Sequence, residues 1–168
     1  MPRPVLLHCS SQTDNMKVLL LLAVLIMAFG PIQVQGSLVE FWQMIWLKTG
    51  QRPEIRYAFY GCHCGVGGKG TPIDETDWCC FKHDCCYARL EELGCGTKFL
   101  TYDFDYKEGQ ITCSENQDSC RKQLCQCDKH ATICFYWNWH SHRNKYQKYA
   151  KNLCRGKTPS CSERMYLI

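Results

Sequence analysis

Cysteine is the residue that most limits what this chain can fold into, because 15 of its 168 residues are cysteines. This density is typical of secreted scaffolds held by disulfides and is rare in reducing compartments. Cys9 lies in an N-terminal leader, so 14 cysteines remain, an even number that allows seven disulfides without a free thiol. The spacing alone does not choose among the many pairings.

The leader spans residues 1–36. Its second half has a basic residue, then a hydrophobic run, then a polar stretch that ends in Gly36. This order is typical of a secretory signal over about residues 16–36, cleaved after Gly36. The alternative is a retained membrane anchor, but the hydrophobic run is short for a bilayer span. Residues 1–15 fit no signal, and we expect one folded domain over residues 37–168.

Charge is unevenly distributed over this domain. Residues 37–120 hold 8 Lys and Arg against 13 Asp and Glu, whereas residues 121–157 hold 9 basic residues and one acid, Asp128. The basic segment favours anionic surfaces such as phospholipid headgroups or heparan sulfate, although a solvated helix face would have the same composition. No zinc-finger spacing or aromatic RNA-binding motif supports a nucleic-acid partner.

A first helix is predicted over residues 38–49, where apolar side chains recur with helical spacing before Gly50. The segment is more hydrophobic than one buried face requires, and it includes Trp42 and Trp46. Two interpretations stay open. Either all of this surface packs in the core, or part of it meets a membrane or a ligand.

The stretch 57–73, YAFYGCHCGVGGKGTPI, is too rich in glycine to form a long regular element. Its glycines allow several carbonyl groups to turn toward one point, and two cysteines can fix the loop in place. Carbonyl oxygens with one carboxylate suit calcium, so the loop is a candidate calcium site. It lacks the final Gly-Lys-Ser/Thr of a phosphate-binding P-loop and the regularly spaced acidic residues of an EF-hand.

The motif CCFKHDCC, residues 79–86, lies in a helix predicted over residues 75–93, with Asp74 or Thr76 as its N-cap and Gly94 after its end. Neighbouring cysteines project in different directions on a helix, so their thiolates do not converge on zinc. Disulfides are therefore the favoured interpretation of these cysteines. Helical spacing puts four side chains of the segment on one face: Cys79, His83, Cys86 and Tyr87.

His83 and Asp84 point about 100° apart on this helix, so they flank one site rather than forming a tight pair. We expect His83 to face a neighbouring helix and Asp84 to face the glycine-rich loop. A carboxylate behind one imidazole nitrogen, which Asp128 could supply, is the arrangement of a general base. The alternative is a histidine without a catalytic role, whose hydrogen bonds are satisfied within a disulfide-linked core.

Two further elements are predicted. Residues 98–113 alternate aromatic and polar side chains around the turn KEGQ, which predicts a short two-stranded hairpin. Residues 119–146 predict a last long helix with an apolar and cysteine-containing stripe. The tail after Cys154 is irregular and contains Cys161.

Three motifs in this order, YGCHCGVGGKG, DWCCFKHDCCY and LCQCDK, resemble secreted phospholipase A2. The resemblance covers residues 37–161. The additional cysteine in the tail, Cys161, resembles the group II subfamily. The stretches FYGCHCGVGGKG, GCGTKFL and CRGKTPSC are most similar to its mammalian group IIA type. It implies a mainly α, disulfide-rich fold. The expected parts are an N-terminal helix, a glycine-rich calcium loop, two long antiparallel helices and a small β-hairpin wing.

The resemblance also implies an activity, the calcium-dependent hydrolysis of the sn-2 ester of glycerophospholipids at membrane surfaces. His83 corresponds to the catalytic histidine that activates water, and Asp128 to the acid behind it. Asp84 corresponds to the calcium carboxylate, and Tyr87 and Tyr102 to tyrosines that bond Asp128. The other implied residues are the loop carbonyls of His63, Gly65 and Gly67, and the substrate-channel collar of Leu38, Phe41 and Ile45.

The family's disulfide pattern pairs all 14 cysteines of the expected domain. The implied pairs are Cys62–Cys154, Cys64–Cys80, Cys79–Cys134, Cys85–Cys161, Cys86–Cys127, Cys95–Cys120 and Cys113–Cys125. The resemblance further implies a secreted, extracellular monomer that binds phospholipid membranes peripherally.

The chain departs from the family pattern in its charge and its tail. The expected domain has a net charge of about +3, whereas group IIA members are usually more basic. Residues 162–168 extend beyond the usual end. A catalytically silent membrane- or receptor-binding relative is the competing hypothesis. Such relatives commonly replace the histidine or the calcium acid, and here both His83 and Asp84 are present.

Overall fold

The structure, a computed structural model, describes residues 17–18 and 36–163. The chain divides into two compact units, Met1–Val34 and Gln35–Ile168, and every element discussed below belongs to the second. The predicted leader falls almost wholly outside the described residues, as does the end of the tail.

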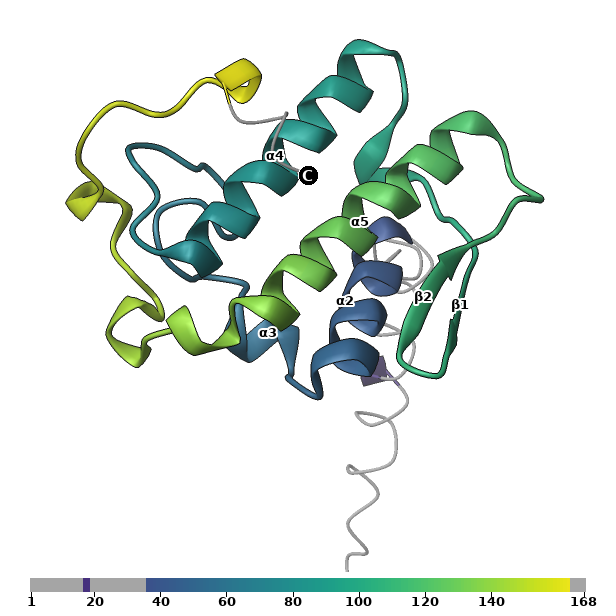
Figure 1. The fold of residues 1–168 in the computed structure, drawn as a ribbon, viewed down its shortest axis with the longest axis horizontal. Coiled ribbons are helices and arrows are strands. Elements are labelled where there is room, and N and C mark those ends of the chain that lie inside the picture. Colours follow the sequence, from purple (N-terminus) through teal and green to yellow (C-terminus); the bar gives the residue numbers. More distant parts are fainter. Residues whose placement is uncertain (1–16, 19–35, 164–168) are drawn as a thin grey trace, which may run out of the picture. The chain divides into compact units, whose positions relative to one another are not determined.

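The second unit is built mainly from helices with one two-stranded antiparallel sheet (Figure 1). Its main elements are α2 (Gly36–Thr49), α3 (Pro53–Arg56), α4 (Glu75–Glu92), β1 (Phe104–Lys107), β2 (Gln110–Cys113) and α5 (Ser119–Trp137). Short 3-10 turns add η1 (Thr97–Phe99), η2 (Trp139–Ser141), η3 (Asn144–Tyr146), η4 (Lys151–Leu153) and η5 (Cys161–Glu163). This architecture confirms the mainly α fold expected from the sequence.

The two long helices, α4 and α5, lie side by side and run in opposite directions (Figure 1). Cys79, near the start of α4, is bonded to Cys134, near the end of α5. Cys86, further along α4, is bonded to Cys127, which comes earlier in α5. The cysteine nearer the start of α4 is thus bonded to the one nearer the end of α5, so these two disulfides hold the two helices antiparallel.

Each of the 14 cysteines in the described domain is bonded to another one, so none is a thiolate ligand for zinc. The pairs are the same as those implied by the family resemblance: Cys62–Cys154, Cys64–Cys80, Cys79–Cys134, Cys85–Cys161, Cys86–Cys127, Cys95–Cys120 and Cys113–Cys125.

Local capping fixes the ends of α4 close to the predicted residues. The carboxylate of Asp74 accepts a hydrogen bond from the backbone N–H of Asp77 at 2.8 Å, so Asp74 is the N-cap. After Glu92, Gly94 adopts a φ of 81° and its N–H bonds the carbonyl of Glu91, which ends the helix.

The last long helix is shorter than predicted, because α5 ends at Trp137 rather than near Tyr146. The amide of Asn138 donates to the carbonyl of Cys134 at 2.9 Å, which caps the end of the helix. The hydroxyl of Ser141 then donates to the carbonyl of Asn138 and lies 2.7 Å from the hydroxyl of Thr76 in α4. These tertiary bonds turn the chain back toward α4, and helical spacing in the sequence does not reveal them.

The hairpin is also shorter than predicted. Strand pairing covers Phe104–Lys107 and Gln110–Cys113, joined by a two-residue turn of Glu108 and Gly109 that both have positive φ. The start of the predicted segment instead forms η1, and its Phe99 is exposed. The strand predicted from alternating aromatic residues was therefore wrong for the first residues of this segment.

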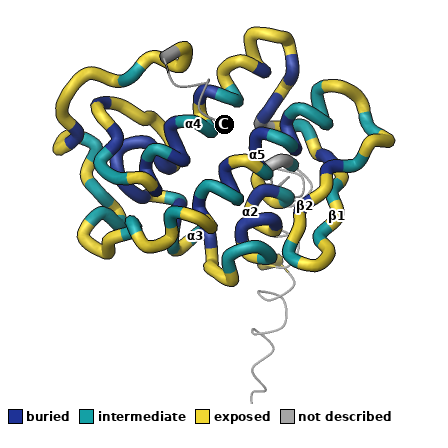
Figure 2. Tube along the Cα trace, viewed as in Figure 1, coloured by how far each residue is buried: buried dark blue, intermediate teal, exposed yellow. Residues whose placement is uncertain are grey.

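Helix α2 has one buried face and one exposed face. Phe41, Met44 and Ile45 are buried, whereas Trp42 and Trp46 are exposed. The dark blue of buried residues accordingly alternates with lighter colours along α2 in Figure 2. Part of the hydrophobic surface of α2 thus lies outside the core. Among the helices in the described ranges, none is both long and apolar enough to cross a membrane.

Candidate active site

His83 projects from α4 toward α5, where its Nε2 lies 2.5 Å from Oδ1 of Asp128. Asp128 is fully buried, while the His83 side chain keeps 13% of its surface exposed. Because Nε2 is engaged by the carboxylate, Nδ1 is the ring nitrogen that remains for another partner. The arrangement expected from the sequence, with His83 facing a neighbouring helix, is present.

Three donors hold the carboxylate of Asp128. Besides His83 on Oδ1, Tyr87 donates its hydroxyl to the same oxygen at 2.7 Å, and Tyr102 donates to Oδ2 at 2.6 Å. Burial, followed by the charge of Asp128, raises the pKa of Tyr102, which keeps its hydroxyl protonated as a donor. A buried carboxylate is costly unless it is hydrogen-bonded, and here both oxygens are satisfied.

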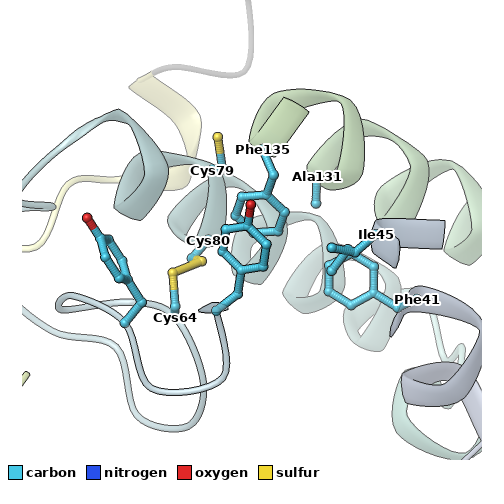
Figure 3. Packing of buried hydrophobic residues seen from close by; sticks show 9 residues of the cluster. Phe41, Ile45, Cys64, Cys79, Cys80, Ala131 and Phe135 are labelled. Atoms are coloured by element: carbon cyan, nitrogen blue, oxygen red, sulfur yellow. A yellow bond between two sulfur atoms is a disulfide. The ribbon is translucent and has the colours of Figure 1, made fainter. Parts of the chain in front are cut away.

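Helix α2 supplies an apolar wall beside the histidine. Phe41 stacks on the imidazole of His83, with ring centroids 4.5 Å apart. Figure 3 shows Phe41 and Ile45 side by side in the hydrophobic cluster that also contains the Cys64–Cys80 disulfide of the glycine-rich loop. Of the three collar residues, Phe41 and Ile45 are therefore buried next to the site, and Leu38 faces solvent.

The glycine-rich loop is held by a buried acid that the sequence analysis missed, Asp77. Its carboxylate accepts hydrogen bonds from the backbone N–H groups of Cys62 at 2.9 Å, His63 at 2.7 Å and Ile73 at 3.0 Å. The approach at Gly61 is so close that a Cβ there would lie 2.5 Å from the Asp77 carboxyl carbon. In the sequence, Asp77 is only an acid in the first turn of a helix, which the helix dipole alone explains.

The same loop comes close to Asp84 on the flank of α4. Gly65 and Gly67 have φ values of 87° and 78°, which favour glycine. A Cβ added to Gly68 would lie 2.6 Å from Nδ1 of His63 and 3.3 Å from Oδ2 of Asp84. The Asp84 carboxylate therefore meets the loop at a point where only glycine leaves room.

Asp84 accepts no hydrogen bond and forms no ion pair with any described residue. Asp84 is exposed at the surface, but partial desolvation by its neighbours still raises the pKa of this carboxyl to about 6. A bound cation would stabilise the charged form. Together with the loop carbonyls expected from the sequence, those of His63, Gly65 and Gly67, Asp84 would provide the oxygen ligands that calcium prefers. Among the described residues, no group of three or more His, Cys, Asp or Glu side chains is placed so that it could hold a metal ion by itself.

A cavity of about 440 Å³ lies between α4 and α5, with His83 on its wall. Its lining includes no residue of α2 or of the glycine-rich loop, and Asp84 is not part of it. The cavity therefore shares His83 with the candidate site but does not include Asp84 or the glycine-rich loop.

Comparison with known proteins identifies the family of this chain. Residues 38–151 match the family model described as phospholipase A2. The chain belongs to the phospholipase A2 family. It is 70% identical over 146 residues to "Phospholipase A2, membrane associated" of Rattus norvegicus, an alignment that covers 87% of this chain and 100% of the relative.

Two further phospholipase A2 relatives support the group II resemblance. The Homo sapiens protein with the same name as the rat relative is 58% identical, again over 146 residues, 87% of this chain and 100% of the relative. The "Group IIE secretory phospholipase A2" of Mus musculus is 48% identical over 126 residues, which are 75% of this chain and 87% of the relative. The family expectation stated from the sequence motifs is thus confirmed.

Proposed function

We propose that this protein hydrolyses the sn-2 ester of glycerophospholipids at membrane surfaces in a calcium-dependent reaction, releasing a fatty acid and a lysophospholipid. The observation that carries the proposal is the 2.5 Å contact between Nε2 of His83 and Oδ1 of Asp128, which leaves Nδ1 as the ring nitrogen that can accept a proton. A base and a cation ligand on one short helix segment suit attack by water on an ester.

In this proposal His83 acts as the general base. Its Nδ1 removes a proton from the attacking water, and Asp128 stabilises the imidazolium that forms. The same proton then passes from Nδ1 to the leaving alcohol oxygen of the lysophospholipid, which restores the neutral histidine. Tyr87 and Tyr102 keep Asp128 in position through both proton transfers.

Calcium, when bound by Asp84 and the carbonyls of His63, Gly65 and Gly67, supplies positive charge next to the ester carbonyl. The backbone N–H of Gly65, on the same loop, would donate to the developing oxyanion. Phe41 and Ile45 exclude water from one side of the histidine and offer an apolar surface to the acyl chain.

The cellular setting is part of the proposal. Seven disulfides support an oxidising, extracellular location, in agreement with the predicted secretory signal. We infer a monomer that binds phospholipid membranes peripherally through α2. The basic segment 121–157 is proposed to bind anionic polymers such as heparan sulfate.

The test is fatty-acid release from mixed phosphatidylcholine and phosphatidylglycerol vesicles by the oxidised chain of residues 37–168, with calcium and with a chelator. We expect release from the sn-2 position with calcium and none with the chelator. A correctly oxidised chain that binds calcium but releases no fatty acid would contradict the proposal. That result would favour the silent membrane- or receptor-binding relative.

A further inference from the structure

The exposed face of α2 presents two tryptophans one helical turn apart. Trp42 is 41% exposed and Trp46 is 56% exposed. Residues four apart lie on the same side of a helix, so the two indoles are neighbours. They point about 100° away from Phe41 and Ile45, which are buried in the core.

These tryptophans form one side of a shallow, open pocket of about 370 Å³ between α2 and α3. The other side comes from the start of α3 and combines a cation with an anion. The lining residues are Trp42, Gln43, Trp46, Arg52, Pro53 and Glu54. The pocket thus brings two indoles, one guanidinium and one carboxylate together within a small volume.

The two charged groups of this pocket are accessible. Nη2 of Arg52 lies 2.7 Å from Oε1 of Glu54, and the side chains are 68% and 36% exposed. Exposed ion pairs contribute little to stability, so both groups are available to a charged ligand. A hydrogen bond from its own backbone N–H, followed by that from Arg52, lowers the pKa of Glu54, which therefore stays ionised at neutral pH.

We propose that the α2–α3 pocket binds the phosphocholine headgroup of a zwitterionic phospholipid. The quaternary ammonium would lie against the faces of Trp42 and Trp46, where cation–π attraction acts, with Glu54 as its counter-charge. The phosphate would pair with Arg52, because a guanidinium matches the geometry of phosphate oxygens. The inference rests on the proposed function as a lipid-surface enzyme and adds the headgroup class that the surface would favour.

The combination of groups favours this headgroup over an anionic one. A phosphatidylglycerol headgroup carries only negative charge, so it would use Arg52, leave the aromatic faces without a cation and be repelled by Glu54. Phosphocholine satisfies all of these groups at once. The modest net charge of the chain, +4 over the full sequence, is consistent with a surface that does not depend on anionic lipid alone.

The test compares binding to phosphatidylcholine vesicles with binding to phosphatidylglycerol vesicles by flotation, in the presence of a chelator so that no lipid is hydrolysed. The first variant is the double replacement Trp42→Leu and Trp46→Leu, which keeps apolar side chains but removes the indole faces. We expect its affinity for phosphatidylcholine to fall by about tenfold, with a much smaller change for phosphatidylglycerol.

The matched control is Trp137→Leu with Trp139→Leu, because these tryptophans are 69% and 64% exposed but lie outside the pocket. The control should keep the phosphatidylcholine preference of the parent. Glu54→Gln, which leaves both indoles in place, should lower binding to phosphatidylcholine and raise binding to phosphatidylglycerol.

An unchanged ratio of the two affinities in both the α2 double variant and Glu54→Gln would overturn the proposal. So would an equal loss in the Trp137 and Trp139 control, since that result would mean that any exposed tryptophan serves. Failure of the proposed hydrolysis would look different, because fatty-acid release with calcium would then be absent in the parent chain while the binding ratio in chelator remained measurable.

Discussion

Two carboxylates flank the same histidine, and they lie in opposite environments. Asp128 on α5 is fully buried and accepts three hydrogen bonds, from His83, Tyr87 and Tyr102. Asp84 on α4 has no such partner among the described residues, and the pKa of its carboxyl is raised to about 6. Asp128 is therefore suited to holding the imidazole of His83 in place, and Asp84 is available to bind a cation.

The comparison teaches that the two sides of the site are stabilised by different means. On the α4–α5 side, disulfides and tyrosine hydroxyls fix the imidazole. On the loop side, Asp77 and the glycines fix the backbone of the loop, while Asp84 accepts no hydrogen bond from a described residue. A substitution on one side of the site should therefore leave the other side intact, so that the contribution of each side can be measured separately.

The largest effect is expected for Asp84→Lys, which breaks the loop side. The substitution replaces the only carboxylate of the calcium set with a cation, so calcium binding should be lost and turnover should fall by more than about a thousandfold. Calorimetric titration with calcium and the vesicle assay measure the two effects. Asp105→Lys, the same charge change on the exposed hairpin, is the control and should keep both properties.

Asp128→Asn disrupts the α4–α5 side of the site. An amide of the same shape no longer stabilises the imidazolium or fixes the tautomer of His83, so turnover should fall by about 10²–10⁴-fold. Calcium affinity, measured by the same titration, should stay that of the parent. A variant that loses calcium affinity along with turnover would show that the two sides are not independent.

Removing the Cys85–Cys161 disulfide, by Cys85→Ser with Cys161→Ser, sharpens the comparison because this bond lies on neither side of the site. Stability should fall by about 2–4 kcal/mol, measured by denaturant unfolding. The activity per folded molecule should equal that of the parent, since the two α4–α5 disulfides remain. A large loss of activity at full folding would mean that the tail helps to form the site.

The smallest difference is expected between the two tyrosines that bond Asp128. Tyr102→Phe removes the hydroxyl donor on Oδ2 and should cost about 1–3 kcal/mol of stability, because that buried oxygen is left unsatisfied. Tyr87→Phe should cost less, since His83 still occupies Oδ1. Thermal unfolding of both variants checks the order, and a larger loss for Tyr87→Phe would contradict this account of the acid.

Much of this site could be predicted from the sequence, because its signals are local. The spacing of CCFKHDCC places His83 and Asp84 on different sides of one helix. The glycines of the loop mark positions where the backbone has a positive φ or too little room for a side chain. The cap of α4 at Asp74 and its end before Gly94 also follow from local residues.

The features that the sequence missed depend on contacts between distant segments. Asp77 reaches back to three backbone N–H groups of the loop, and no local pattern shows this. The early end of α5 is set by bonds among Asn138, Ser141 and Thr76, although helical spacing continues beyond it. The hairpin begins late because the chain before it forms η1 and then places the hydroxyl of Tyr102 on Asp128.

The central claim is that His83 is the base and that calcium is held independently of it. The most direct test is His83→Gln in the chain of residues 37–168, with calcium affinity and sn-2 release measured on the same sample. The account predicts the calcium affinity of the parent together with a loss of release of at least about a thousandfold. Release that persists at the parent's rate would contradict it.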